Sequence, residues 1–322
     1  MNRAPLIFAA CFAFLFSFRA SSAQTKVWQP SPGHTQIAIW PATPPDAQPV
    51  PGPETVKSDP NSLIAGKPTE GIANVTRPTI TVYSPNEKNT GVAVVVFPGG
   101  GFEMLAIDLE GTEVCDWLTS QGITCVLLKY RVPSLPYDWR CNCRPNNRAI
   151  STQSLEDAQR TMGLVRLHAA EYHIDPHKIG VLGFSAGGYL IAEISTNFAR
   201  RLYKPVDAAD KQSCRPDFAV GVYPGHLWVD GNNYKLNPNV PVTRQTPPTF
   251  LVQAEDDNVD GVNQALTYFI ALKNAGVPAE LHIYAHGGHA FGLRRTNLPI
   301  TDWPTLVEKW LTTIGMTSPS DR

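Results

Sequence analysis

The stretch Lys178-Ile-Gly-Val-Leu-Gly-Phe-Ser-Ala-Gly-Gly-Tyr-Leu190 decides the fold expected for this chain of 322 residues. Residues 179–182 are a short apolar run that predicts a buried strand, and residues 189–198 continue with helical spacing. Between them lies G-x-S-x-G, a motif that holds a serine on a sharp strand-to-helix turn. Neighbouring backbones are so close in this turn that only glycine fits on both sides. We therefore predict that Ser185 is a nucleophile, the alternative being an ordinary turn with a helix-capping serine.

Apolar runs typical of strands alternate with helical patterns on both sides of this motif. This alternation predicts an α/β fold of one domain, with a mostly parallel central sheet and helices on both faces. Little sequence is left between the segments for a large lid. Further strands are predicted at residues 36–39, 79–83, 92–97, 123–128, 218–223, 249–254 and 279–284, and further helices at residues 110–120, 155–172, 262–274 and 303–314.

The composition is that of an ordinary globular protein, with 43% hydrophobic residues, 17% charged residues and a formal net charge of -1. A chain of this length has enough residues for one large core. A net charge near zero gives no electrostatic reason to expect a nucleic acid or an anionic membrane as partner. Composition says nothing about the oligomeric state.

The first 23 residues have the pattern of a secretory signal peptide. Asn2-Arg3 is a basic start, residues 6–16 are apolar, and Ser21-Ser22-Ala23 has the small residues of a cleavage site, with cleavage expected after Ala23. The apolar run is too short to span a bilayer. We therefore expect a secreted or periplasmic protein. Residues 24–78, rich in Pro, Gly, Thr and Asn, predict an extended arm on a catalytic domain of residues 79–322.

Five cysteines follow the predicted signal peptide. Cys115 falls in a helical pattern and Cys125 in a strand, so each is expected as a small buried core residue. The other three lie in sequence typical of loops, where an oxidising compartment permits a disulfide between Cys214 and either Cys141 or Cys143. The Cys-x-Cys spacing has no matching partners for a metal ion, and no metal or cofactor is expected.

A nucleophilic serine needs a base, usually histidine, and a carboxylate that orients the histidine. After a G-x-S-x-G serine these partners follow in the order acid, then histidine, each beyond the end of a strand. The strand at 249–254 leads into Glu255-Asp256-Asp257-Asn258-Val259, and the strand at 279–284 leads into a segment with His286 and His289. The carboxyl ends of parallel strands meet at one edge of a sheet, so we expect these segments to converge on Ser185.

An oxyanion also needs N–H donors that already point at it. The amide of Ala186, directly after the serine, is the first expected donor, and the loop after residues 92–97 provides Gly100 and Gly101 as the second source. A run of glycines is also compatible with a simple tight turn or a phosphate-binding loop. A P-loop would continue with Lys-Ser/Thr, and Phe102-Glu103 stands there instead.

Three side chains that follow predicted strands are candidate substrate contacts: Phe102, His226 and Trp228. An aromatic residue in such a position serves packing at least as often as binding, so both interpretations stay open.

As a set, the motifs of this chain resemble the α/β-hydrolases related to bifunctional acetylxylan and feruloyl esterases. More distantly, they resemble the esterase/lipase and prolyl-oligopeptidase-type hydrolases. The resemblance covers residues 92–314 and leaves out the arm and the loop around residues 141–143. It rests on the segments Phe97-Pro98-Gly99-Gly100-Gly101-Phe102, Leu128-Lys129-Tyr130-Arg131, Asp157-Ala158-Gln159-Arg160, Ile174-Asp175-Pro176, residues 180–188, Asp256-Asp257-Asn258-Val259 and residues 287–292.

The resemblance implies a role for each member of the predicted site. Ser185 is the nucleophile and His289 the general base, because Phe291-Gly292 follows His289 as it does in the family. The acid implied by the Asp-Asp-Asn-Val motif is Asp256, with Asp257 as the competitor, which is otherwise a turn or cap residue. His286, the competitor for His289, would then lie at the entrance or the surface.

These features together predict an exported serine ester hydrolase that acts through an acyl-enzyme. By resemblance, the substrate would be a short acyl group, such as acetyl, on a small molecule or a polysaccharide such as xylan. A peptidase of the prolyl-oligopeptidase type is one alternative, although no propeller-length segment precedes the domain. A non-catalytic carbohydrate-binding protein is the other, and it predicts a broken triad. The base must be neutral, so activity should fall as the pH drops through the histidine pKa, near 6.5 if unperturbed.

Overall fold

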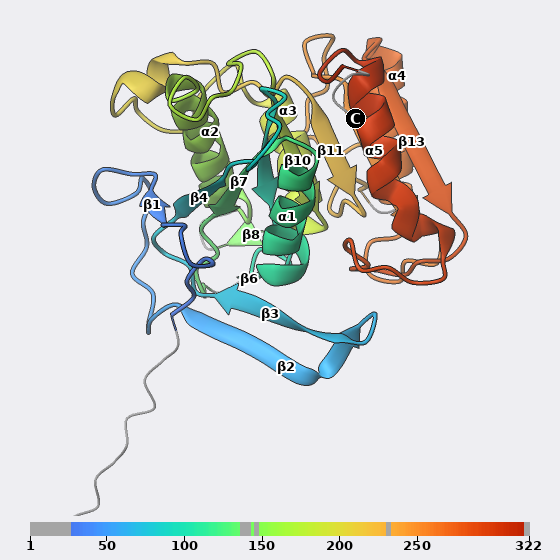
Figure 1. The fold of residues 1–322 in the computed structure, drawn as a ribbon, viewed down its shortest axis with the longest axis horizontal. Coiled ribbons are helices and arrows are strands. Elements are labelled where there is room, and N and C mark those ends of the chain that lie inside the picture. The colour runs from blue at the N-terminus through green and yellow to red at the C-terminus, as the bar shows by residue number, and fades with distance from the viewer. Residues whose placement is uncertain (1–26, 136–142, 145–147, 230–232, 319–322) are drawn as a thin grey trace, which may run out of the picture.

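An eight-stranded sheet runs through the centre of the protein (Figure 1), in the order β1-β4-β7-β5-β10-β11-β12-β13. The structure is a computed structural model that describes residues 27–135, 143–144, 148–229 and 233–318. The strands are β1 (Ile37–Ala38), β4 (Thr79–Tyr83), β7 (Thr124–Lys129), β5 (Ala93–Phe97), β10 (Ile179–Phe184), β11 (Ala219–Val222), β12 (Thr249–Ala254) and β13 (Ala279–Tyr284).

The sheet is parallel from β7 to β13 and antiparallel only at the edge formed by β1 and β4. The nucleophile strand β10 lies between β5 and β11, where Val181 pairs with Val95 on one side and Ala219 on the other. Every residue of β5, β7, β10, β11 and β12 is buried, which explains why these strands are continuously apolar rather than alternating. The predicted mostly parallel α/β fold is confirmed.

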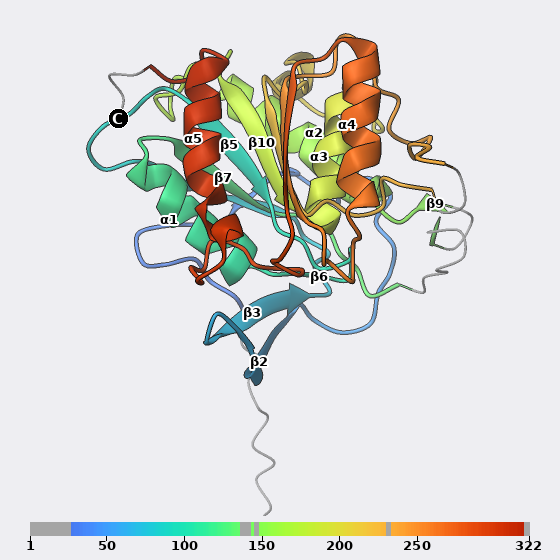
Figure 2. The same cartoon turned by 90° about the vertical axis from the view of Figure 1, so that its right-hand side faces the viewer.

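Helices cover both faces of the sheet (Figure 2). One face is covered by α1 (Glu113–Ser120) and α5 (Trp303–Thr313), and the other by α2 (Thr152–Leu167), α3 (Ala186–Thr196) and α4 (Asn263–Ala275). α1 begins from a π-helical turn, η1 (Asp108–Thr112), in which the Thr112 amide donates to the Ile107 carbonyl. Short 3-10 turns are formed by η3 (Ala208–Lys211) and η4 (Pro299–Asp302). The sequence pattern predicted the helices but not the π turn.

The region expected as an extended arm contains a β-hairpin in addition to β1. Its strands β2 (Thr55–Ile64) and β3 (Lys67–Ala73) form a small sheet with β6 (Met104–Leu105), which follows the triple glycine. The Arg294 guanidinium, in the segment after β13, donates to the carbonyls of Lys67 and Pro68 at 2.8 and 3.0 Å. The hairpin therefore supports two loops of the predicted site. A further short pair is formed by β8 (Cys143–Arg144) and β9 (Arg148–Ala149).

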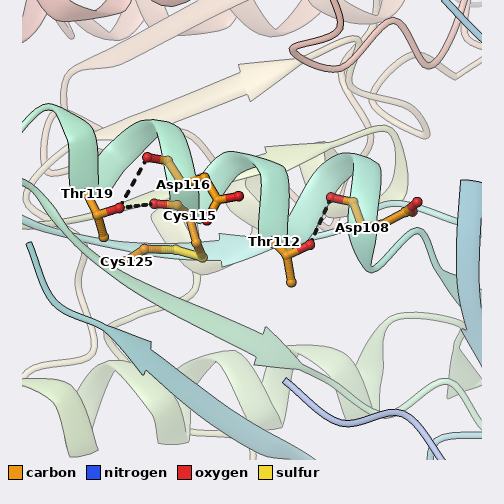
Figure 3. Close-up of a disulfide and its surroundings, with 6 residues drawn as sticks. All are labelled: Asp108, Thr112, Cys115, Asp116, Thr119 and Cys125. Atoms are coloured by element: carbon orange, nitrogen blue, oxygen red, sulfur yellow. Dashed lines mark hydrogen bonds between the residues drawn. A yellow bond between two sulfur atoms is a disulfide. The ribbon is translucent and has the colours of Figure 1, made fainter. Parts of the chain in front are cut away.

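The cysteines differ from the prediction. Cys115 of α1 and Cys125 of β7 form a disulfide (Figure 3), because the chain reverses between them and brings their Cα atoms to 5.1 Å. Both are buried in the core, as predicted, but they are bonded to each other. The expected bridge from Cys214 is also wrong, since Cys214 is a free, buried thiol that donates to the Phe198 carbonyl at 3.3 Å. Cys141 lies outside the described residues, as does the predicted signal peptide.

Candidate active site

Ser185 lies on the turn between β10 and α3. Its backbone angles, φ 50° and ψ -117°, are rarely adopted by residues other than glycine. The two glycines of the motif, Gly183 and Gly187, have no room for a side chain. A β-carbon at Gly183 would lie 2.2 Å from the Gly187 carbonyl oxygen, and one at Gly187 would lie 2.0 Å from the Phe97 carbonyl oxygen. The packed core thus holds a strained turn in place and leaves the Ser185 side chain at the carboxyl end of the sheet.

His289 and Asp257 complete a continuous hydrogen-bonded chain with Ser185. His289 Nε2 lies 3.0 Å from Ser185 Oγ, and His289 Nδ1 lies 2.7 Å from Asp257 Oδ2. Asp257 is buried, and its Oδ1 accepts the amides of Val259 and Asp260, both at 2.9 Å. The carboxylate therefore points inward from the loop after β12 and meets the loop after β13.

The carboxylate next to His289 belongs to Asp257. The expectation that Asp256 is the acid beside this histidine is therefore wrong. Asp256 Oδ1 accepts the amides of Gly287 and Gly288 at 2.9 and 2.8 Å, and Oδ2 lies 3.2 Å from Nδ1 of His286. His286 is 75% exposed, which agrees with its expected place at the surface. Asp256 thus fixes the backbone of the loop that presents His289, while the next residue makes the contact with the imidazole.

The surroundings of His289 favour a protonated imidazole more than water would. Burial alone lowers the pKa of His289, but the hydrogen bond and negative charge of Asp257 act in the opposite direction. Asp260 and Glu110 add further negative charge, and the net result is a raised pKa. The imidazole is therefore a stronger base than a free histidine, which suits a group that must take a proton from a hydroxyl.

The glycine loop after β5 lies against the serine. A β-carbon at Gly99 would lie 2.9 Å from Ser185 Cβ, and the Gly99 amide donates to Glu110 Oε2 at 2.6 Å. Within the described ranges, no group accepts a hydrogen bond from the amides of Gly100, Gly101 or Ala186. Gly100 and Gly101 have φ of 126° and 65°, in the region that favours glycine. These three amides are the ones predicted as oxyanion donors.

Glu110, expected from the sequence only as the start of a helix, is a buried acid. Besides the Gly99 amide, its carboxylate accepts the Tyr223 hydroxyl at 2.9 Å, and that hydroxyl accepts the Gly292 amide at 3.3 Å. The Tyr223 ring centre lies 4.9 Å from that of His289. Burial raises the pKa of Glu110. One carboxylate therefore connects the glycine loop, the residue after β11 and the histidine loop.

The three predicted substrate contacts lie in different environments. Phe102 is fully buried and packs against Tyr130, Tyr189 and His226, which favours the packing interpretation over substrate contact. His226 and Trp228 are half-buried in the segment after β11. Strained backbone gathers around the site, since left-handed φ values occur at Phe102, Ser185, Tyr223, His226 and Ala290.

A parallel sheet with helices on both faces and a G-x-S-x-G turn at its carboxyl end defines an α/β-hydrolase. The model of the prolyl oligopeptidase family matches residues 114–314, more than half of the chain. The chain therefore belongs to that family, and the predicted resemblance is confirmed.

Similar proteins include two curated relatives from bacteria. An acetylxylan esterase of Xylanibacter ruminicola is 32% identical over 228 residues, which are 64% of this chain and 42% of the relative. Endo-1,4-beta-xylanase B of Butyrivibrio fibrisolvens is 25% identical over 232 residues, 66% of this chain and 34% of the relative. The chain thus matches less than half the length of either relative.

Solved structures of the same fold include an acetyl ester-xyloside bifunctional hydrolase from Caldicellulosiruptor lactoaceticus. It is 33% identical, with a TM-score of 0.67, and the match covers 88% of this chain and 97% of that one. Esterase Est2 of Thermogutta terrifontis has a TM-score of 0.60 at 21% identity, with 79% of this chain and 95% of that one covered, and shows a similar fold. In the part of the chain that the structure describes, no helix combines the length and apolar character needed to cross a membrane.

Proposed function

We propose that the protein is a serine carboxylic-ester hydrolase that forms an acyl-enzyme on Ser185. The observation that carries the proposal is the hydrogen-bonded chain from Ser185 Oγ through His289 to the buried Asp257, at 3.0 and 2.7 Å. This arrangement gives a hydroxyl the base that it needs and gives the base a fixed orientation.

In the proposed reaction, Ser185 Oγ attacks the ester carbonyl carbon while its proton passes to His289 Nε2. Asp257 holds the ring through Nδ1 and stabilises the imidazolium. In this reaction the amides of Gly100, Gly101 and Ala186 donate hydrogen bonds to the oxyanion. His289 then gives the proton to the leaving alcohol, and a water molecule, activated by the same histidine, hydrolyses the acyl-enzyme.

The proposed substrate is a short acyl ester, above all an acetyl group on a carbohydrate such as xylan. The names of the acetylxylan esterase and of the acetyl ester-xyloside hydrolase support this choice of acyl group and alcohol. The signal peptide proposed at residues 1–23 would bring the enzyme to the periplasm or the medium.

Peptide hydrolysis is the second candidate, because the matching family model takes its name from a peptidase. The same three side chains serve ester and peptide hydrolysis, so the triad geometry does not separate the two. A proline-containing peptide 4-nitroanilide separates them, and we expect its turnover to be far slower than that of acetate esters.

The test is hydrolysis of 4-nitrophenyl acetate, butyrate and octanoate by the mature protein and by Ser185→Ala. We expect the acetate to be the fastest of the three, and kcat to fall by about 10⁴-fold or more in the variant. Ser120→Ala, an exposed serine at the end of α1, is the matched control and should hydrolyse all three esters like the parent protein.

Acetate release from acetylated xylan follows as the test of the polymer. Equal ester hydrolysis by the parent protein and Ser185→Ala would contradict the proposal. Complete inactivity of the folded parent protein on every ester would favour the non-catalytic carbohydrate-binding alternative.

A further inference from the structure

Besides Asp257, the site has a second carboxylate, that of Asp260, which contacts the serine directly. Its Oδ2 accepts a hydrogen bond from Ser185 Oγ at 3.2 Å and lies 3.9 Å from His289 Nε2. The Asp260 side chain is only 15% exposed. The serine hydroxyl therefore has two acceptors for its single proton, and the second is not part of the Ser185–His289–Asp257 chain.

The groups around this carboxylate come from several loops of the site. His226, after β11, lies close enough to influence its charge, and the negative Asp257 on its own loop opposes ionisation. A β-carbon at Gly225 would lie 2.5 Å from Asp260 Oδ1, so the glycine makes room for the acid. Among the residues that the structure describes, no lysine or arginine forms an ion pair with Asp260. Burial raises the pKa of this carboxyl group.

Acylation removes the donor that Asp260 uses in the free protein. When the bond between Ser185 Oγ and the acyl carbon forms, the proton leaves through His289 and Oγ becomes an ester oxygen without hydrogen. The carboxylate then faces the acylated serine with no hydroxyl to bind. A largely buried carboxylate without a donor is costly, so a substrate that brings its own donor to this position is favoured.

We infer that Asp260 is a specificity-determining residue whose carboxylate accepts a hydrogen bond from a hydroxyl carried by the substrate beside the scissile ester. The inference rests on the proposed ester hydrolysis and narrows its substrate class to hydroxylated esters. The hydroxyl can belong to the alcohol, as in a partly acetylated sugar, or to the acyl group, as in a hydroxy acid.

Two pairs of small esters distinguish these sources. On the alcohol side, 2-hydroxyethyl acetate is compared with 2-methoxyethyl acetate. On the acyl side, methyl glycolate is compared with methyl methoxyacetate. Each pair differs by replacement of a donating hydroxyl with a methyl ether that cannot donate. The measured quantity is the ratio of kcat/KM within a pair, which does not depend on the fraction of folded enzyme.

We expect the parent protein to prefer the hydroxylated ester by about tenfold in one of the pairs. Asp260→Val, which has no acceptor, should bring that ratio to about one. Asp260→Asn, which keeps an acceptor oxygen, should retain part of the preference. The matched control is Glu255→Gln, an exposed carboxylate on the same loop, which should keep the parent ratio.

A ratio near one in both pairs for the parent protein, or an unchanged preference in Asp260→Val, would overturn the inference and leave ester hydrolysis standing. Failure of the parent protein to hydrolyse any of the four esters and 4-nitrophenyl acetate in a Ser185-dependent manner would overturn both. Preference in the alcohol pair would identify a polyol or sugar ester, and preference in the acyl pair a hydroxy-acid ester.

Discussion

Two groups of acids in this protein differ in the kind of partner that they have. The active-site acids, Asp257 and Asp260, follow β12 and meet histidine, a hydroxyl and backbone amides. The arginine cluster, at α2, pairs each of its acids with a guanidinium. It consists of Arg131, Arg160, the buried acids Glu156, Asp157 and Asp210, and the exposed Asp207.

The bonds of the arginine cluster are short and mostly buried. Arg131 lies 2.9 Å from both Glu156 and Asp157, and Asp157 also accepts the Trp40 indole N–H at 2.8 Å. Because Trp40 belongs to the N-terminal arm, the cluster attaches the arm to α2. A guanidinium keeps its positive charge at neutral pH, whereas the histidine partners of the active-site acids can gain and lose a proton.

The largest expected effect separates two adjacent carboxylates of the active site. Asp257→Asn should lower kcat by about 10⁴-fold, because an amide cannot hold His289 in the same tautomer or stabilise the imidazolium. Asp256→Asn should cost less than about tenfold, because an amide oxygen still accepts the Gly287 and Gly288 amides. Steady-state hydrolysis of 4-nitrophenyl acetate measures both. The reverse order of the two effects would restore Asp256 as the acid.

The next largest effect is a loss of stability with little change in kcat. Asp157→Asn leaves Arg131 with one buried acid fewer and should lower the free energy of unfolding by about 3 to 5 kcal/mol. Urea unfolding measures this loss, with kcat of the folded protein expected within about threefold of the parent. Asp302→Asn, whose pair with Arg295 is 65% and 77% exposed, is the control and should change stability by less than about 1 kcal/mol. A large loss of kcat in folded Asp157→Asn would contradict the distinction between a structural arginine cluster and catalytic active-site acids.

Glu110 tests whether a buried acid outside the triad positions the loops around it. Glu110→Gln should lower kcat by about tenfold with little change in KM, because the glycine loop loses a charged acceptor for the Gly99 amide. The acid limb of kcat/KM should also move to lower pH, because the negative charge of Glu110 raises the pKa of His289. An unchanged limb together with lower thermal stability would mean that Glu110 acts only in folding.

The smallest effect is a shift in the pH profile of the parent protein. Only neutral His289 can accept the serine proton, so kcat/KM should fall as the pH drops through its pKa. Because Asp257, Asp260 and Glu110 raise that pKa, the fall should begin above the 6.5 of an ordinary histidine. A flat profile between pH 5 and 8, with the protein folded throughout, would contradict a histidine base.

The sequence was sufficient to predict the central sheet and the loops that contain the candidate site. Strands at residues 79–83, 249–254 and 279–284 occur with the predicted bounds, although only the strand at 249–254 is buried along its whole length. Ser185 follows the strand predicted at residues 179–182, His289 follows the strand at 279–284, and the structure brings the two side chains together.

The remaining differences depend on where individual side chains point. Asp256 and Asp257 are identical in chemistry, and only the turn after β12 directs the second one inward. The role of Glu110 depends on a π-helical turn that apolar periodicity does not reveal. The Cys115–Cys125 disulfide follows from the packing of α1 on β7, and cysteine spacing does not encode that packing. The hairpin of β2 and β3 was missed because its residues are mostly polar.

The most direct test of the central claim is covalent labelling with a fluorophosphonate, followed by mass spectrometry of the digested protein. We expect one phosphonyl group per chain, on the peptide that carries Ser185. We also expect no label in Ser185→Ala and much slower labelling in Asp257→Asn than in Asp256→Asn. Label on another residue, or full labelling of Ser185→Ala, would contradict the proposal that Ser185, His289 and Asp257 work as a nucleophile, a base and its orienting acid.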